Sequence, residues 1–118
     1  MDEKRIQEVL RRCWSSRTST KWTAQNPAAG QCAVTALVIN DQFGGRILKM
    51  KIGDLWHFYN EIAGRRVDFT AEQFVGPLSY SDTPSSREDA FTDAMPDQYQ
   101  VLAERYAEEI GGESCSGE

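Results

Sequence analysis

Three residues in this chain have the side-chain chemistry of a nucleophilic catalytic site: Cys32, His57 and Asp68, in that order. A cysteine attacks carbonyl carbon when a neighbouring base moves its proton, and the base needs a third group that orients its ring. His57 is the only histidine, so imidazole chemistry has a single candidate. Cys32 lies at the predicted start of a helix, where unpaired backbone N–H groups and the helix dipole stabilise a thiolate. The three residue types therefore predict a cysteine-based site.

Two strands flanking Ala63-Gly64 are expected to form a hairpin, because β-branched and aromatic residues surround a turn signal there. The predicted strands run from 56 to 61 and from 66 to 69. One face of the hairpin is expected to pack into the core through its large apolar side chains, Trp56, Phe58, Val67 and Phe69.

The register of this hairpin decides which carboxylate meets His57. A four-residue loop from Glu61 to Gly64, ending in a left-handed glycine, places His57 opposite Asp68. Opposed Cβ atoms lie about 4.5–5.5 Å apart, within reach of an imidazole–carboxylate hydrogen bond. A tight turn at Gly64-Arg65 is the competing register, and it places Glu72 opposite His57. The glycine position favours the first register.

Each candidate residue also has a purely structural interpretation. A cysteine on an apolar helix is often a small core residue, and a histidine in an aromatic strand is often structural. Asp68 is also placed to cap a helix that follows Thr70. Cys, His and Asp can together bind zinc, but the paired spacings of zinc sites, such as CxxC or HxxxH, do not occur. The sequence therefore predicts no metal and no cofactor.

The length and charge of the chain limit its class and its partners. Its 118 residues predict one domain over residues 1–112, followed by a flexible tail over residues 113–118. Thirteen Lys and Arg against eighteen Asp and Glu give a net charge of −5. Nucleic acid and anionic membrane both attract clustered positive charge, so neither is an expected partner. A peptide or protein is the expected substrate or partner.

Three further features indicate a cytoplasmic protein. No apolar run approaches the roughly 18 residues of a membrane span, and the first residues lack the apolar stretch of a signal peptide. The three cysteines are an odd number without paired spacing, so a disulfide framework is not expected.

The pattern of apolar residues predicts an α+β fold with helices on both sides of the strands along the chain. A helix over 2–13 has one apolar stripe, and the apolar run 32–43 suits either a strand or a buried helix. The helix is favoured, because the run is long and ends at Gly44-Gly45. A strand over 46–52 and the hairpin follow. The remaining predicted elements are a short helix from Ala71, another after Ser85, and a last helix over 97–110.

Five blocks of sequence resemble the YunG-like family of uncharacterised small bacterial proteins: Asn26-Pro27-Ala28, Gly30 to Leu37, Phe43-Gly44-Gly45, His57-Phe58-Tyr59-Asn60 and Val67-Asp68-Phe69-Thr70. The order of a helix-borne Cys, a strand-borne His and an Asp on the next strand is similar to that of papain-like cysteine peptidases, especially their transglutaminase-like and bacterial amidase branches. The resemblance implies a minimal papain-like core, in which the Cys-bearing helix packs on a small antiparallel sheet.

The papain-like resemblance also implies an oxyanion donor and a reaction. In that fold a glutamine six residues before the nucleophile helps to form the oxyanion hole. Asn26 occupies this position, with the same amide on a shorter arm. The expected activity is that of a cysteine hydrolase or acyltransferase acting on an amide bond. The alternative is a non-catalytic interaction module that keeps the same fold.

Overall fold

The computed structural model describes residues 2–116, and the side chains of residues 2–111. Within that range the chain has an α+β fold, which confirms the predicted class. The helices are α1 (Glu3–Cys13), α2 (Cys32–Phe43), α3 (Arg87–Ala90) and α4 (Pro96–Ser116), with the 3-10 helix η1 (Ala71–Gln73). The strands are β1 (Arg46–Ile52), β2 (Leu55–Ile62), β3 (Arg65–Val67) and β4 (Thr83–Pro84), which form one antiparallel sheet in the order β3-β2-β1-β4.

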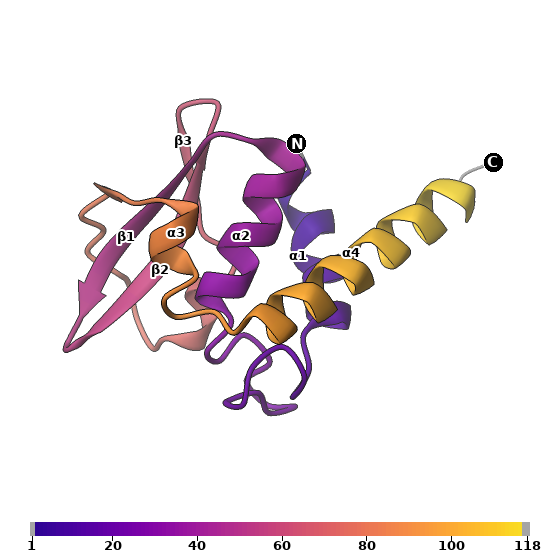
Figure 1. Cartoon of the computed structure of the whole chain (residues 1–118), viewed down its shortest axis with the longest axis horizontal. Helices are drawn as coiled ribbons and strands as arrows, with labels where there is room; N and C mark the ends of the chain where they lie inside the picture. The colour runs from indigo at the N-terminus through magenta and orange to yellow at the C-terminus, as the bar shows by residue number, and fades with distance from the viewer. Residues whose placement is uncertain (1, 117–118) are drawn as a thin grey trace.

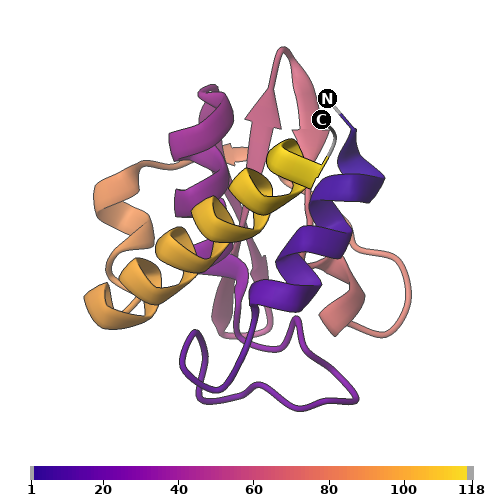
Figure 2. The ribbon, with the colours of Figure 1, turned by 90° about the vertical axis from the view of Figure 1, so that its right-hand side faces the viewer.

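Helix α2 forms the middle layer of the molecule, between the sheet and the pair α1 and α4 (Figures 1 and 2). Every residue from Ala33 to Ile39 is buried and all but Thr35 are apolar, which explains why this run has no polar face. The helix ends at Gly44 as predicted. The following Gly45 has a φ of +76°, and a Cβ there would lie 2.0 Å from the carbonyl oxygen of Glu61. Glycine is therefore required where the chain turns from α2 toward the sheet.

The β2–β3 hairpin has a shorter loop than the predicted one. Ile62 pairs with Arg65, so the loop is the two-residue turn Ala63-Gly64, with φ values of +52° and +78°. Both registers considered for this hairpin are therefore wrong. A two-residue turn with two left-handed residues matches the twist of antiparallel strands, and this match outweighs the cost of placing alanine there. If the pairing continued along both strands, this register would place Thr70 opposite His57. The strand β3 ends at Val67, however, so this pair does not form.

Replacing Ala63 by Asn should stabilise the protein by about 0.5–1 kcal/mol. Asparagine tolerates the left-handed conformation that costs other L-residues about 1 kcal/mol or more, and Asn-Gly is the preferred pair for this turn. Urea unfolding of both proteins measures the difference. Ala107→Asn, at an exposed alanine in regular helix, is the control and should show no gain. A less stable Ala63→Asn protein would contradict the turn conformation.

Two helix starts differ from the predicted capping patterns. The Thr70 side chain makes no capping hydrogen bond, and the segment after it forms only the 3-10 helix η1. Helix α3 is capped by Ser86, whose hydroxyl accepts a hydrogen bond from the backbone N–H of Asp89 at 3.0 Å. Ser85, the predicted cap, instead donates to the Asp89 carboxylate at 2.7 Å.

Helix α4 begins at Pro96 and continues past the predicted end at Ile110 to Ser116. A glycine costs about 1 kcal/mol relative to alanine inside a helix but can still adopt helical angles, so Gly111-Gly112 does not have to end it. The flexible tail predicted over residues 113–118 lies outside the residues whose side chains are described. None of the described helices is both long and apolar enough to cross a membrane.

Candidate active site

His57 and Asp68 are in direct contact, as the sequence predicts. Nε2 of His57 lies 2.6 Å from Oδ2 of Asp68, and the two side chains are only 1% and 5% exposed. The contact does not arise from cross-strand pairing, because the chain leaves the sheet after Val67. Asp68 reaches the imidazole from the segment that follows β3.

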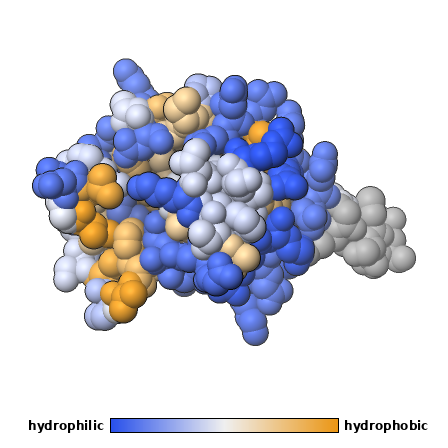
Figure 3. All heavy atoms as spheres, turned by 90° about the horizontal axis from the view of Figure 1, so that it is seen from below, coloured by the Kyte–Doolittle hydropathy of each residue, from blue (hydrophilic) through white to orange (hydrophobic). Residues whose placement is uncertain are grey.

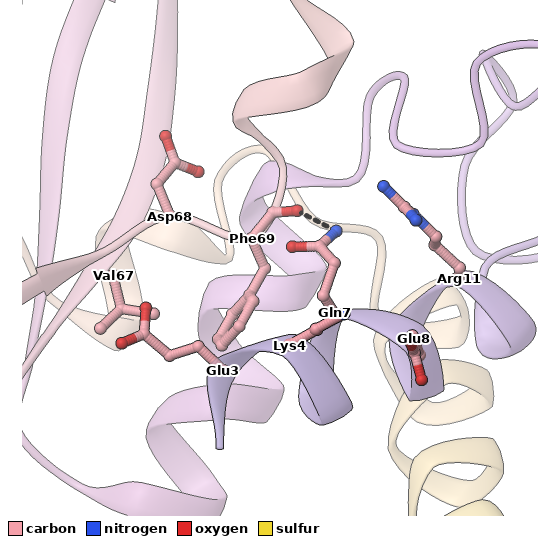
Figure 4. A pocket seen from close by; sticks show the side chains of 8 residues that line it. All are labelled: Glu3, Lys4, Gln7, Glu8, Arg11, Val67, Asp68 and Phe69. Carbon is pink, nitrogen blue, oxygen red and sulfur yellow. Dashed lines mark hydrogen bonds between the residues drawn. The ribbon is translucent and has the colours of Figure 1, made fainter. Parts of the chain in front are cut away.

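Helix α1 holds that segment in place. The side-chain amide of Gln7 donates to the backbone carbonyl of Phe69 at 2.8 Å, and Arg11 forms an ion pair with Glu72. Figure 4 shows Gln7 pointing toward Phe69, whereas the Asp68 carboxylate points away from α1. A cavity of about 410 Å³ lies between α1 and this segment; Asp68 lines it, but none of its described lining residues is a cysteine or a histidine. The Asp68 carboxylate therefore belongs to the site that contains His57, on the side of this segment that faces away from α1.

Asp68 accepts hydrogen bonds from three residues. Its Oδ2, which meets His57, also accepts from the Tyr80 hydroxyl at 2.8 Å. Its Oδ1 accepts from the backbone N–H of Thr70 at 3.2 Å and from the Thr70 hydroxyl at 3.3 Å. The carboxylate thus contacts the imidazole and also braces the turn at Thr70. Hydrogen bonds of this kind fix the orientation of the carboxylate.

The sequence did not predict the contact of Tyr80 with Asp68, because Tyr80 lies in a loop without periodicity. Asp82 anchors that loop by pairing with Arg66, with an Nε–Oδ1 distance of 2.7 Å, and by accepting from the Tyr59 hydroxyl at 3.0 Å. The guanidinium of Arg66 also lies over the Tyr80 ring, 4.3 Å from its centroid. These contacts cover the sheet face that carries His57. No spacing in the sequence indicates this return of the chain across the sheet.

The second ring nitrogen of His57, Nδ1, is buried and has no hydrogen-bond partner in the described part of the chain. Phe74 packs edge-on against the imidazole at 5.0 Å between ring centroids. Burial lowers the pKa of His57, but the hydrogen bond that its Nε2 donates to Asp68 and the adjoining Cys32 side chain outweigh burial and raise that pKa to about 9. The imidazole is therefore protonated at neutral pH.

Cys32 is the first residue of α2, as predicted, and it lines a cavity of about 720 Å³ together with His57. The side chain is partly buried, and the first-turn N–H groups of a helix lack partners within the helix. Cys13 differs, because it is a buried core residue whose pKa is raised to about 11, chiefly by burial. Of these two cysteines, only Cys32 lies at a cavity with the histidine.

Asn26 lies apart from this cavity. Its side-chain nitrogen points toward the backbone carbonyl of Gln73 at 3.4 Å, and Asn26 does not line the cavity. Gln73 itself does line it. The Oε1 atom of Gln73 accepts from the backbone N–H of Gly30 at 3.1 Å, whereas its Nε2 is buried and has no hydrogen-bond partner among the described residues. The predicted oxyanion role of Asn26 stays a prediction, and Gln73 is a second amide, in the lining of the cavity that also contains Cys32.

Trp56 does not belong to the core as the sequence suggested. It is 40% exposed and lines the same cavity, whereas the other apolar residues predicted for that face, Phe58, Val67 and Phe69, are buried. Nζ of Lys49 lies 4.4 Å from the centroid of the Trp56 ring. Trp56 lies near the end of the β1–β2 hairpin, where the packed helices no longer cover the sheet.

The described residues contain no group of three or more His, Cys, Asp or Glu side chains arranged to hold a metal ion. The buried polar contacts of the site involve the imidazole, the carboxylate and the Tyr80 hydroxyl. Their arrangement suits proton transfer next to a thiol.

The fold and this site define a small α+β protein in which Cys32 and His57 line one cavity and Asp68, which is not part of that lining, contacts His57. The family model described as "YunG protein" matches residues 2–111. A Bacillus subtilis (strain 168) protein named "Uncharacterized protein YunG" is 50% identical over 102 residues, which cover 86% of this chain and 89% of that protein. The chain belongs to the YunG family. No solved structure matches it.

Proposed function

We propose that the chain is a cysteine hydrolase or acyltransferase that acts on an amide bond. The main support is the placement of His57, whose Nε2 is bound to Asp68 while its Nδ1 is left without a partner. Cys32 lines the same cavity as the histidine. The order of these residues on a helix, a strand and the following segment is that of papain-like peptidases, and we propose a minimal form of that fold.

In the first half of the proposed reaction, the Cys32 thiolate attacks the amide carbonyl carbon. A C–S bond forms, and the carbonyl π electrons move to oxygen. When the oxyanion collapses, the C–N bond breaks and the leaving nitrogen takes the proton from Nδ1 of His57. Asp68 orients the ring and stabilises the imidazolium before this transfer. The products are a thioester on Cys32 and a free amine.

In the second half, neutral His57 accepts a proton from water or from an acceptor amine as that nucleophile attacks the thioester. The C–S bond then breaks, the sulfur leaves as a thiolate, and His57 is again protonated. The backbone N–H of Cys32 at the start of α2 is one donor for the oxyanion. We assign the second donor to Gln73, because its side-chain nitrogen is unpartnered and the residue lines the cavity.

Alkylation of Cys32 by iodoacetamide tests this proposal without a known substrate. At pH 7 the native Cys32 should react at least about tenfold faster than the same residue in urea-denatured protein, because a thiolate is the reactive form and a free cysteine ionises near pH 8.5. His57→Gln should remove most of this difference. Peptide mass spectrometry assigns the label to Cys32.

Cys13 serves as the internal control, since its burial should keep it unlabelled in the native protein. A native Cys32 that reacts only after denaturation would favour the interaction module over the enzyme. Equal rates in wild type and His57→Gln would likewise exclude an activated Cys–His pair.

A further inference from the structure

Large apolar side chains lie unusually exposed beside the candidate nucleophile. Leu55 is 64% exposed, Met95 61% and Trp56 40%, and all three line the cavity that contains Cys32 and His57. Ile52 and Phe74 extend this apolar lining. Figure 3 shows hydrophobic surface gathered toward the left end of the lower face, the end where the β1–β2 hairpin lies in Figure 1. Exposed apolar residues gathered around one cavity indicate a binding site.

The charge of the lining restricts what this cavity can bind. Among the described residues of the lining, Lys21 and Asp93 are the charged ones apart from the proposed Cys32–His57 pair, and their charges are opposite and exposed. The polar lining residues Ser19, Thr20 and Gln98 are uncharged. The lining therefore provides little electrostatic attraction for a strongly charged ligand. A volume of about 720 Å³ suits a group as large as an aromatic side chain.

We propose that the cavity is an acyl-binding site for substrates with a large apolar or aromatic side chain next to the reacting carbonyl. Leu55, Trp56 and Met95 would contact that side chain while the carbonyl lies at Cys32. This inference rests on the proposed function, because it assigns the acyl part of the same substrate. Selectivity for a large apolar side chain over a small one comes from the apolar area that it buries, so it increases with the size of the side chain.

Maleimides of different size test this site directly. The ratio of the Cys32 rate constants for N-phenylmaleimide and N-methylmaleimide should be at least about fivefold higher in the native protein than in urea-denatured protein. Leu55→Ser and Met95→Ser should each lower that native ratio about twofold or more. Both residues are well exposed, so these changes spare the core. Val75→Ser is the matched control, because Val75 is fully exposed but does not line the cavity, and it should keep the wild-type ratio.

Iodoacetamide separates the two proposals, because it is small and carries no apolar group. A fast iodoacetamide reaction with a native phenyl-to-methyl ratio equal to the denatured one would overturn the apolar site and leave the activated cysteine in place. A slow iodoacetamide reaction with a high ratio would support the apolar site and overturn the proposed enzyme. Equal losses of the ratio in Leu55→Ser and Val75→Ser would also overturn the assignment of the site.

Discussion

Asp68→Asn should lower the pKa of His57 from about 9 toward that of free histidine, near 6.5. Burial alone disfavours the imidazolium, and the carboxylate is the main group that reverses this effect. The change exceeds two pKa units, which is more than a hundredfold in proton affinity. His57 is the only histidine, so one imidazole signal followed by NMR against pH reports it without assignment.

Two variants control this titration. Tyr80→Phe removes another hydrogen bond to the same Oδ2 atom but keeps the carboxylate, so the pKa of His57 should stay well above 6.5. Asp54→Asn removes an exposed carboxylate in the β1–β2 turn and should leave the titration unchanged. If Asp68→Asn also titrated near pH 9, Asp68 would not be the group that holds the proton on His57.

The wild type should have a higher free energy of unfolding than Asp68→Asn, and this difference should decrease by about 3 kcal/mol between pH 6 and pH 9.5. The pKa of His57 is raised from 6.5 to about 9 in the folded protein, and each unit corresponds to about 1.4 kcal/mol. A raised pKa means that this stabilisation is fully present below the unfolded value of about 6.5. It is then lost as pH rises through about 9.

Urea unfolding of both proteins across this pH range measures the effect. Comparing the two variants cancels the titration of Cys13, whose pKa of about 11 adds its own loss of stability at alkaline pH in both. A difference in the free energy of unfolding that stays constant from pH 6 to pH 9.5 would contradict a protonated His57 in the wild type. A difference that grows with pH would reverse the sign of the linkage and contradict it as well.

The N-cap of α3 shows that the local sequence does not always determine which residue caps a helix. Ser85 and Ser86 are adjacent hydroxyl residues before the same short helix, and either can cap it by residue type alone. Ser86 is the cap because Ser85 donates its hydrogen bond to the Asp89 carboxylate instead. That carboxylate also forms an ion pair with Lys49 of β1. A contact between distant parts of the chain thus selects between two equivalent local solutions.

The sequence by itself determined the elements that carry the site and the order of its residues along the chain. The length of the apolar run and its terminal glycine pair favoured a buried helix from Cys32 over a strand, because these end signals are local. The contact between His57 and Asp68 was also predicted, but from a hairpin register that is wrong; Asp68 reaches the imidazole from the segment after β3.

Only the tertiary structure decided how these residues meet and what surrounds them. The short turn at Ala63-Gly64 changed the register, and the segment held by Gln7 still brought Asp68 to His57. Tyr80 reaches the same carboxylate because its loop folds back across the sheet, and Trp56 is exposed because the helices do not cover the hairpin end. These placements depend on contacts between residues far apart in the sequence, which local periodicity and capping do not encode.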